Sequence, residues 1–298
     1  MKLSRRSLLA RAAAFPIASR VASAAPAARQ IPVGLELYSV RGEFARHPVA
    51  TIQVVAKMGY QVVEFYAPYF DWTPQFARQM RTFLDDAGLQ CRSTHNNAPS
   101  FTAEGLKKAA ELNKILGSTY VVMASTGRIA GLDGWKLLCD QLNGIQETLK
   151  PMGLRSGYHN HQVEFVPLEG KRPIEIIAAN TPKDFMMQFD VGTSIEAGSD
   201  PVAWIKSNPG RIKSIHCKDW APGVASKPES KPESKPESKE DKGYRVLFGE
   251  GVAPWPQIFE AAESTGGVEY YLIEQEGSRY PELETAERCL ATWRALRG

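Results

Sequence analysis

The stretch "VGLELYSVRGEFARHPVATIQVVAKMGYQVVEFYAP", residues 33–68, contains one complete strand–helix–strand unit. Its two ends, 33–40 and 61–68, are short runs rich in β-branched and aromatic residues, which predict strands. Between them, residues 47–59 have the apolar periodicity of a helix and finish on Gly59, a common helix stop. A doubly wound sheet would usually carry a glycine-rich loop after its first strand, and this unit has none. The unit therefore favours a barrel of parallel strands over an open sheet.

The same unit recurs along the chain. Eight strand-like runs alternate with helix-like segments, and most of the runs begin about 27 to 30 residues apart. The predicted strands are 33–40, 61–68, 89–96, 118–125, 154–161, 184–191, 211–218 and 269–276. Eight such units predict a single (β/α)₈ barrel domain over residues 30–298.

The first 25 residues do not belong to the barrel. Ser4, Arg5 and Arg6, followed by an alanine-rich and weakly apolar run, resemble a twin-arginine export signal. Arg11 and Arg20 interrupt the apolar run before it reaches the roughly 20 residues that a membrane span needs. We therefore predict a periplasmic or secreted protein, exported folded and without a membrane anchor.

A second segment also falls outside the repeat. Residues 226–243 contain three copies of Ser-Lys-Pro-Glu and no apolar side chain. Such a segment has nothing to bury, so we predict a disordered insertion in the loop before the last strand. A lid over the mouth of the barrel is the alternative interpretation.

Composition excludes several classes of protein. Hydrophobic residues make up 43% of the chain and charged residues 23%, values typical of a globular domain. The net charge of +3 is spread along the chain, which argues against a nucleic-acid partner. The four cysteines show no CxxC spacing, so they predict buried thiols, not a zinc knuckle. The sequence leaves the oligomeric state open, a homo-oligomer included.

Metal-capable side chains gather at the predicted strand ends. The motif "GYHNHQVEF", residues 157–165, places two histidines one residue apart, and alternation along a strand turns both to one face. The C-terminal ends of barrel strands converge on one mouth. A mixed set of imidazole nitrogens and carboxylate oxygens suits Mn, Co or Zn with an open position for substrate. The candidates at strand ends are Glu64, His95, His159, His161, Asp190, His216 and Glu274. Each alone has an ordinary explanation; Asp190, for example, could cap the next helix.

Five motifs together resemble the xylose isomerase-like barrel superfamily, and within it the proteins called sugar phosphate isomerase/epimerase. They are "GYHNHQVEF" (157–165), "FDVGTSIEAGSDP" (189–201), "IHCKDW" (215–220), "FGEGVAPWPQIF" (248–259) and "YLIEQEG" (271–277). The resemblance implies one divalent metal, commonly Mn, with Co or Zn as alternatives. It also implies that Asp190, His216 and Glu274 are ligands, together with a strand-five glutamate.

Strand five departs from that pattern. His159 stands where many relatives carry the glutamate, so either His159 coordinates or Glu164 folds back to supply a carboxylate. We prefer His159. An imidazole in place of a carboxylate makes the site one unit more positive, which leaves the metal preference open.

The resemblance also implies the chemistry. A metal that polarises a carbonyl acidifies the neighbouring C–H, as isomerisation, epimerisation or β-elimination of a keto sugar requires. We expect Glu274 or His161 as the base, His95 as a further catalytic group on the opposite wall, and Lys218 as a contact for a substrate oxygen. A salt bridge from Lys218 to Asp219 or Glu250 is the structural alternative. The predicted substrate contacts are Glu64, Tyr66, Trp220 and Glu164.

Other functions stay open at this point. An exported enzyme would meet a free sugar or glycoside, since phosphorylated sugars are cytoplasmic. A lyase or hydratase acting on 3-keto-glycosides is the main enzymatic alternative, and an exported sugar-binding or degenerate barrel is the non-enzymatic one. An endonuclease IV-like centre would need three metals, and hence more ligands than these strand ends supply.

Overall fold

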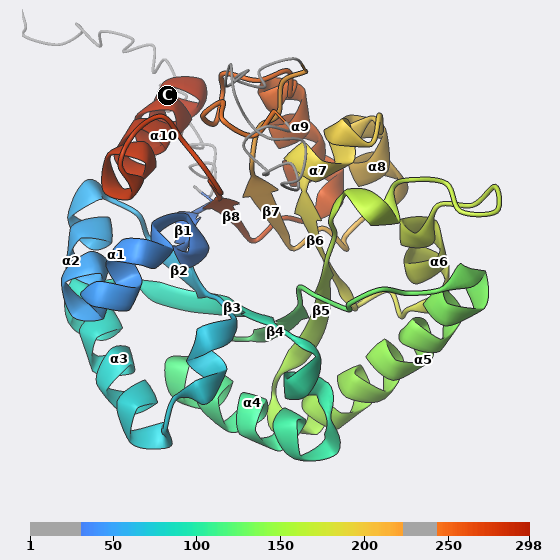
Figure 1. Ribbon diagram of the computed structural model, residues 1–298, viewed down its shortest axis with the longest axis horizontal. Helices are drawn as coiled ribbons and strands as arrows, with labels where there is room; N and C mark the ends of the chain where they lie inside the picture. Colours follow the sequence, from blue (N-terminus) through green and yellow to red (C-terminus); the bar gives the residue numbers. More distant parts are fainter. Residues whose placement is uncertain (1–30, 223–242) are drawn as a thin grey trace, which may run out of the picture. The chain divides into compact units, whose positions relative to one another are not determined.

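The computed structural model describes residues 31–222 and 243–298. Within them, eight parallel strands close into a barrel in chain order, and β8 pairs with β1 (Figure 1). The strands are β1 Val33–Glu36, β2 Val62–Phe65, β3 Gln90–Asn96, β4 Tyr120–Met123, β5 Arg155–His159, β6 Met186–Asp190, β7 Ser214–Cys217 and β8 Tyr270–Ile273. The predicted fold class is confirmed, and all eight predicted strands exist.

Two predicted segments cannot be compared with the structure. The export signal, residues 1–25, lies outside the described residues, and so does the Ser/Lys/Pro/Glu insertion except for Gly243. Both stay predictions.

Each strand is shorter than predicted: β3 begins one residue later, and the other seven end earlier because the chain leaves the strand as it reaches the mouth of the barrel. The first predicted strand, 33–40, is β1 followed by a 3-10 turn, η1 Leu37–Val40. The Glu36 carboxylate accepts a hydrogen bond from the backbone N–H of Tyr38, which starts this turn. Strand ends that carry polar side chains therefore also begin the following turns.

Helices surround the strands (Figure 1). They are α1 Arg41–Arg46, α2 Pro48–Met58, α3 Pro74–Ala87, α4 Ala103–Leu116, α5 Gly131–Leu149, α6 Pro173–Asn180, α7 Val191–Glu196, α8 Pro201–Ser207, α9 Trp255–Ala261 and α10 Glu282–Arg297. The predicted stop of α2 is confirmed, since Gly59 adopts a left-handed φ of 104°. No helix among the described residues is long and apolar enough to cross a membrane.

The interior of the barrel has an apolar floor and a polar top. Even-numbered strands fill the floor, and their side chains are Val62, Tyr120, Val122, Met186, Tyr270 and Leu272. Odd-numbered strands contribute small inward residues below the mouth, such as Gly34, Ser93, Gly157 and Ser214. A Cβ on Gly34 would lie 2.5 Å from the carbonyl oxygen of Val62, so only glycine fits there. The buried carboxylates and imidazoles of the barrel interior therefore lie at the C-terminal ends of the strands.

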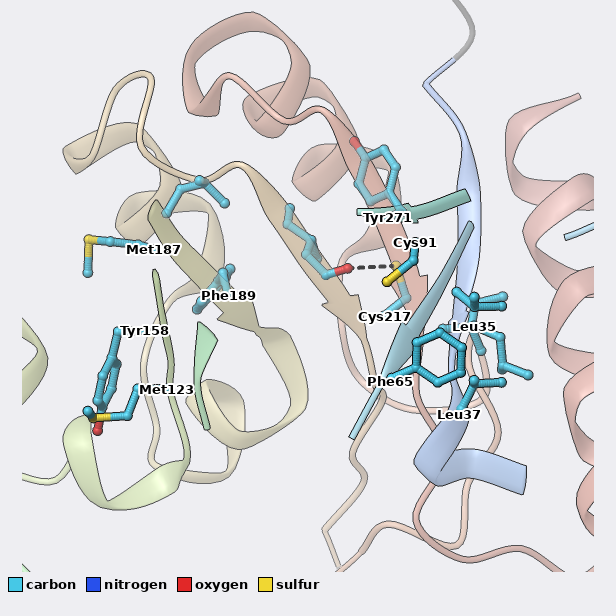
Figure 2. Close-up of a cluster of buried hydrophobic side chains, with 14 of the residues drawn as sticks. Leu35, Leu37, Phe65, Cys91, Met123, Tyr158, Met187, Phe189, Cys217 and Tyr271 are labelled. Carbon is cyan, nitrogen blue, oxygen red and sulfur yellow. Dashed lines mark hydrogen bonds between the residues drawn. The ribbon is translucent and has the colours of Figure 1, made fainter. Parts of the chain in front are cut away.

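Alternate strand residues point outward and form the larger apolar layer beneath the helices. Figure 2 shows Leu35, Phe65, Met123, Tyr158 and Phe189 among these side chains. All four cysteines are free and buried, as predicted, and Cys91 and Cys217 lie in this layer. The packing holds the strand ends rigidly, as a preorganised site requires.

Candidate metal centre at the mouth of the barrel

Four ligand-type side chains meet at the mouth. His159 and Asp190 are the last residues of β5 and β6, His216 lies in β7, and Glu274 directly follows β8. All four are buried, and one ligand atom of each lies within 4.8 Å of the others. We call these four residues the metal cluster. The distances suit side chains that converge on one ion, so the cluster could bind a metal.

The two oxygens of Asp190 have different surroundings. Oδ1 accepts a hydrogen bond of 2.9 Å from the backbone N–H of Thr193 and so caps α7. Oδ2 is buried without a hydrogen-bond partner; Lys218 Nζ lies 3.5 Å and His159 Nε2 3.9 Å away. The predicted capping role is therefore real but uses one oxygen only. A bare, buried carboxylate oxygen is costly unless a cation or proton meets it, which fits a metal site.

His216 is held between two carboxylates. Its Nδ1 lies 2.7 Å from Glu274 Oε2, and its Nε2 lies 2.9 Å from Glu64 Oε2. Burial alone would lower the pKa of His216, but the hydrogen bonds to both carboxylates outweigh burial and raise the pKa to about 10. Metal-ligating histidines commonly donate their second ring N–H to a carboxylate in this way. Glu64 can therefore orient His216 while Nδ1 serves as the ligand atom.

Gln188, which was not among the predicted site residues, determines which ring nitrogen carries the proton in His95 and in His159. Its Nε2 donates to Glu64 Oε1 and to Ser214 Oγ, both at 2.9 Å, so its Oε1 must act as an acceptor. That oxygen lies 2.6 Å from His95 Nε2 and 3.2 Å from His159 Nδ1. These two nitrogens therefore carry the protons. Burial lowers the pKa of both histidines, so each ring is neutral and keeps one nitrogen lone pair.

Lys218 is buried beside the metal cluster. Its Nζ contacts Glu276 and lies 3.5 Å from Asp190 Oδ2 and 3.6 Å from Glu274 Oε1. Burial by itself lowers the pKa of Lys218, but Glu274, Asp190 and Glu276 outweigh it and hold the pKa above its ordinary value. The side chain is thus a fixed positive charge at the edge of the cluster.

The structural alternative for Lys218 is wrong. Asp219 accepts a 2.8 Å hydrogen bond from the indole N–H of Trp255 and so holds the loop after β7 in place. Glu250 pairs with Arg279 at 2.6 Å. Neither carboxylate is among the partners of Lys218.

Two side chains from the opposite side of the barrel, Glu64 and His95, contact the metal cluster directly. Glu64 and His95, expected there, lie on β2 and β3, and the His95 ring stacks on the His216 ring with 5.0 Å between centroids. Glu64 is fully buried and its oxygens face His95, His216 and Gln188. This arrangement favours an orienting role for Glu64 over the predicted contact with substrate.

The position of Glu164 favours His159 as the strand-five ligand. Its Oε1 accepts from the Tyr158 hydroxyl at 2.6 Å and its Oε2 from the backbone N–H of His161 at 2.7 Å. The His161 side chain accepts in return from the backbone N–H of Glu164, which completes a capping box. His159, not Glu164, lies in the metal cluster. Glu164 fixes the turn that carries His161, whose ring packs 5.1 Å from that of His159.

The remaining predicted substrate contacts lie at the rim. Tyr66 is half-buried and packs edge-on against Tyr38, with ring centroids 5.5 Å apart. Trp220 follows β7 and is also half-buried. Both stay predictions for sugar stacking.

A pair of variants tests the strand-five position. We expect His159→Ala to weaken metal binding by more than the roughly 10- to 100-fold typical of losing an outer hydrogen-bond partner, because a ligand atom disappears. Glu164→Gln should leave metal content unchanged. Metal content after dialysis checks both, and metal loss in Glu164→Gln alone would reverse the assignment.

Comparison with known proteins identifies relatives in sequence and in structure. An inosose dehydratase from Geobacillus thermodenitrificans (strain NG80-2) is 26% identical over 143 residues, which cover 48% of this chain and 47% of the relative. The chain thus spans about half the length of the inosose dehydratases that it matches.

Solved structures match over a longer range. The crystal structure of a sugar phosphate isomerase/epimerase from Parabacteroides distasonis ATCC 8503 has a TM-score of 0.70 and 25% identity, covering 92% of this chain and 97% of that one. An IOLI protein with a bound zinc atom shares the fold, with a TM-score of 0.64, 15% identity and coverage of 89% and 97%.

The family model described as xylose isomerase-like TIM barrel matches residues 52–296. That range holds seven of the eight strands and every residue of the metal cluster. The chain belongs to the xylose isomerase-like TIM barrel family.

Proposed function

We propose that this protein is a metal-dependent enzyme that isomerises or epimerises a keto sugar by removing a proton next to its carbonyl. The observation that carries the proposal is the buried Oδ2 of Asp190, which accepts no hydrogen bond, among nitrogen and oxygen donors within 4.8 Å of one another. This donor set suits Mn, with Co or Zn as alternatives.

Each side chain of the metal cluster would offer one atom to the ion. His159 offers Nε2, because Gln188 holds the proton on Nδ1. Asp190 offers Oδ2, and His216 offers Nδ1 while its Nε2–H donates to Glu64. A divalent ion held in this way polarises a carbonyl and lowers the pKa of the adjacent C–H.

Glu274 is the base that we assign to the proton transfer. Its Oε2, which lies 2.7 Å from His216 Nδ1, would be the oxygen that it offers to the ion, whereas Oε1 faces Lys218 at 3.6 Å and would accept a proton from substrate carbon. His161 is the matching donor. One of its ring nitrogens accepts from the backbone of Glu164, so the other carries the proton in the neutral ring and can donate it to a substrate oxygen.

Lys218 would contact a second substrate oxygen. Its ammonium lies beside the cluster, held by three carboxylates, so it would meet negative charge that develops on oxygen. The predicted export supports a free sugar or glycoside over a phosphorylated one, and the family supports a sugar-like substrate.

Dehydration is the second candidate, and the matches to inosose dehydratases favour it. Elimination begins with the same proton transfer to Glu274. The hydroxyl on the next carbon then leaves as water with a proton from His161, and a C=C bond forms. The two reactions need the same cluster and differ only in whether that oxygen leaves.

Turnover in D₂O distinguishes the candidates. With Mn(II) and a panel of keto sugars and keto-cyclitols, we expect deuterium at the carbon next to the carbonyl and a product of unchanged composition. A product lighter by one water would establish the dehydratase. A chain that binds sugar without any metal and exchanges no proton would instead be a binding protein, which contradicts the proposal.

A further inference from the structure

A second group of ligand-type side chains lies beside the metal cluster. Glu36 ends β1, Glu64 lies in β2 and His95 lies in β3, and one ligand atom of each falls within 4.8 Å of the others. Glu36 is 1% exposed and Glu64 is fully buried. Two carboxylates this close inside a protein need a positive partner.

Glu36 repeats the arrangement of Asp190. One of its oxygens, Oε2, accepts from the backbone N–H of Tyr38 and so starts the turn after β1. The other, Oε1, is buried without a hydrogen-bond partner. In both residues the following turn anchors one oxygen and leaves the second one bare inside the barrel.

Glu36 Oε1, which accepts no hydrogen bond, faces the ring nitrogen of His95 that keeps its lone pair. His95 donates its Nε2–H to Gln188, so Nδ1 keeps its lone pair, and Nδ1 lies 3.6 Å from Glu36 Oε1. That separation is too long for a hydrogen bond. An ion with bonds of about 2.0 to 2.2 Å would join the two atoms at roughly 110 to 120°, close to the angles of ordinary coordination.

We propose that Glu36, Glu64 and His95 form a second divalent-cation site, so that the mouth of the barrel binds two ions. Gln188 contacts one histidine of each site and fixes its tautomer. His159 Nε2 then keeps its lone pair for the first ion, and His95 Nδ1 keeps its lone pair for the second. Glu64, whose oxygens also accept from Gln188 and His216, would complete the second site with a further lone pair of one of them. The proposal goes beyond the proposed reaction, which needs one ion only.

Metal stoichiometry tests the second site. The purified chain is stripped with a chelator, dialysed against saturating Mn(II), and analysed for bound metal by mass spectrometry. We expect two ions per chain, one in Glu36→Gln, one in Asp190→Asn and none in the double variant. Glu43→Gln is the matched control, because this partly exposed glutamate on α1 pairs with Arg46 at 2.6 Å and lies outside both groups of ligand-type residues; it should keep both ions.

The opposite results overturn the second site. One ion in the unmodified chain would mean that a proton, not a metal, lies between Glu36 and His95. Two ions that persist in Glu36→Gln would place the second ion elsewhere. His95→Gln replaces Glu36→Gln should that variant not fold, as judged by circular dichroism. A one-ion protein that still exchanges deuterium would leave the proposed function intact, whereas a two-ion protein without exchange would refute only the function.

Discussion

We expect Asp190→Asn to remove the proposed ion from the metal cluster and to lower kcat/KM by at least about a thousandfold, since such an ion would be worth several kcal/mol to the transition state. Asparagine keeps the size of the side chain and an oxygen that can still cap α7 through the N–H of Thr193. The negative charge is lost and an NH2 group, which cannot bind a metal ion, replaces Oδ2. The loss should therefore fall on metal binding and activity and not on folding. Metal analysis and steady-state kinetics measure the two effects.

Asp200→Asn is the matched control for this variant. Asp200 caps α8 as Asp190 caps α7, with Oδ1 accepting from the N–H of Val202 at 2.8 Å, but it lies outside the metal cluster. We expect unchanged metal content and activity. Equal behaviour of the two variants, or full metal in Asp190→Asn, would show that Asp190 is only a helix cap.

Lys218→Met should destabilise the metal-free protein by about 3 to 5 kcal/mol, because it leaves buried carboxylates without their positive partner. Those carboxylates are Asp190, Glu274 and Glu276. Adding Mn(II) should recover part of the loss, since an ion that binds the folded state stabilises it. Urea unfolding with and without the metal measures both quantities.

Lys213→Met provides the comparison. Lys213 precedes β7 and its half-buried side chain pairs with Glu269 at 3.4 Å, so its replacement should cost less than about 1 kcal/mol. Similar losses for the two lysines, or a loss in Lys218→Met that metal leaves unchanged, would contradict the assigned electrostatic role.

Much of the metal cluster could be predicted because barrel topology converts sequence position into spatial position. His159, Asp190, His216 and Glu274 each end or adjoin a strand, and the C-terminal ends of barrel strands meet. Ligand-type residues at equivalent places along the repeat therefore had to be close. No such rule gives the distances between them.

Two residues of the mouth were missed for physical reasons. Glu36 was hidden inside a predicted strand that in fact ends at this residue, so it did not stand out as a strand end. Gln188 is an amide and a poor metal ligand, although it shares the inward face of β6 with Asp190, two residues away. Its role depends on hydrogen bonds to two other strands, which alternation along one strand does not reveal.

Local spacing already indicates the position of Glu164. Glu164 follows His161 by three residues, the spacing of a capping box, and the structure contains that box. The reach of Glu64 across the barrel to His216 could not have been predicted, because it depends on the width of the closed barrel and on side-chain rotamers.

The most direct test is the anomalous-scattering map of crystals grown with Mn(II). The cluster predicts a peak about 2.0 to 2.3 Å from His159 Nε2, Asp190 Oδ2, His216 Nδ1 and a Glu274 oxygen, as is typical of such bonds. A map without a peak among these four side chains, in crystals whose chain carries bound Mn(II), would contradict the assignment of the metal site.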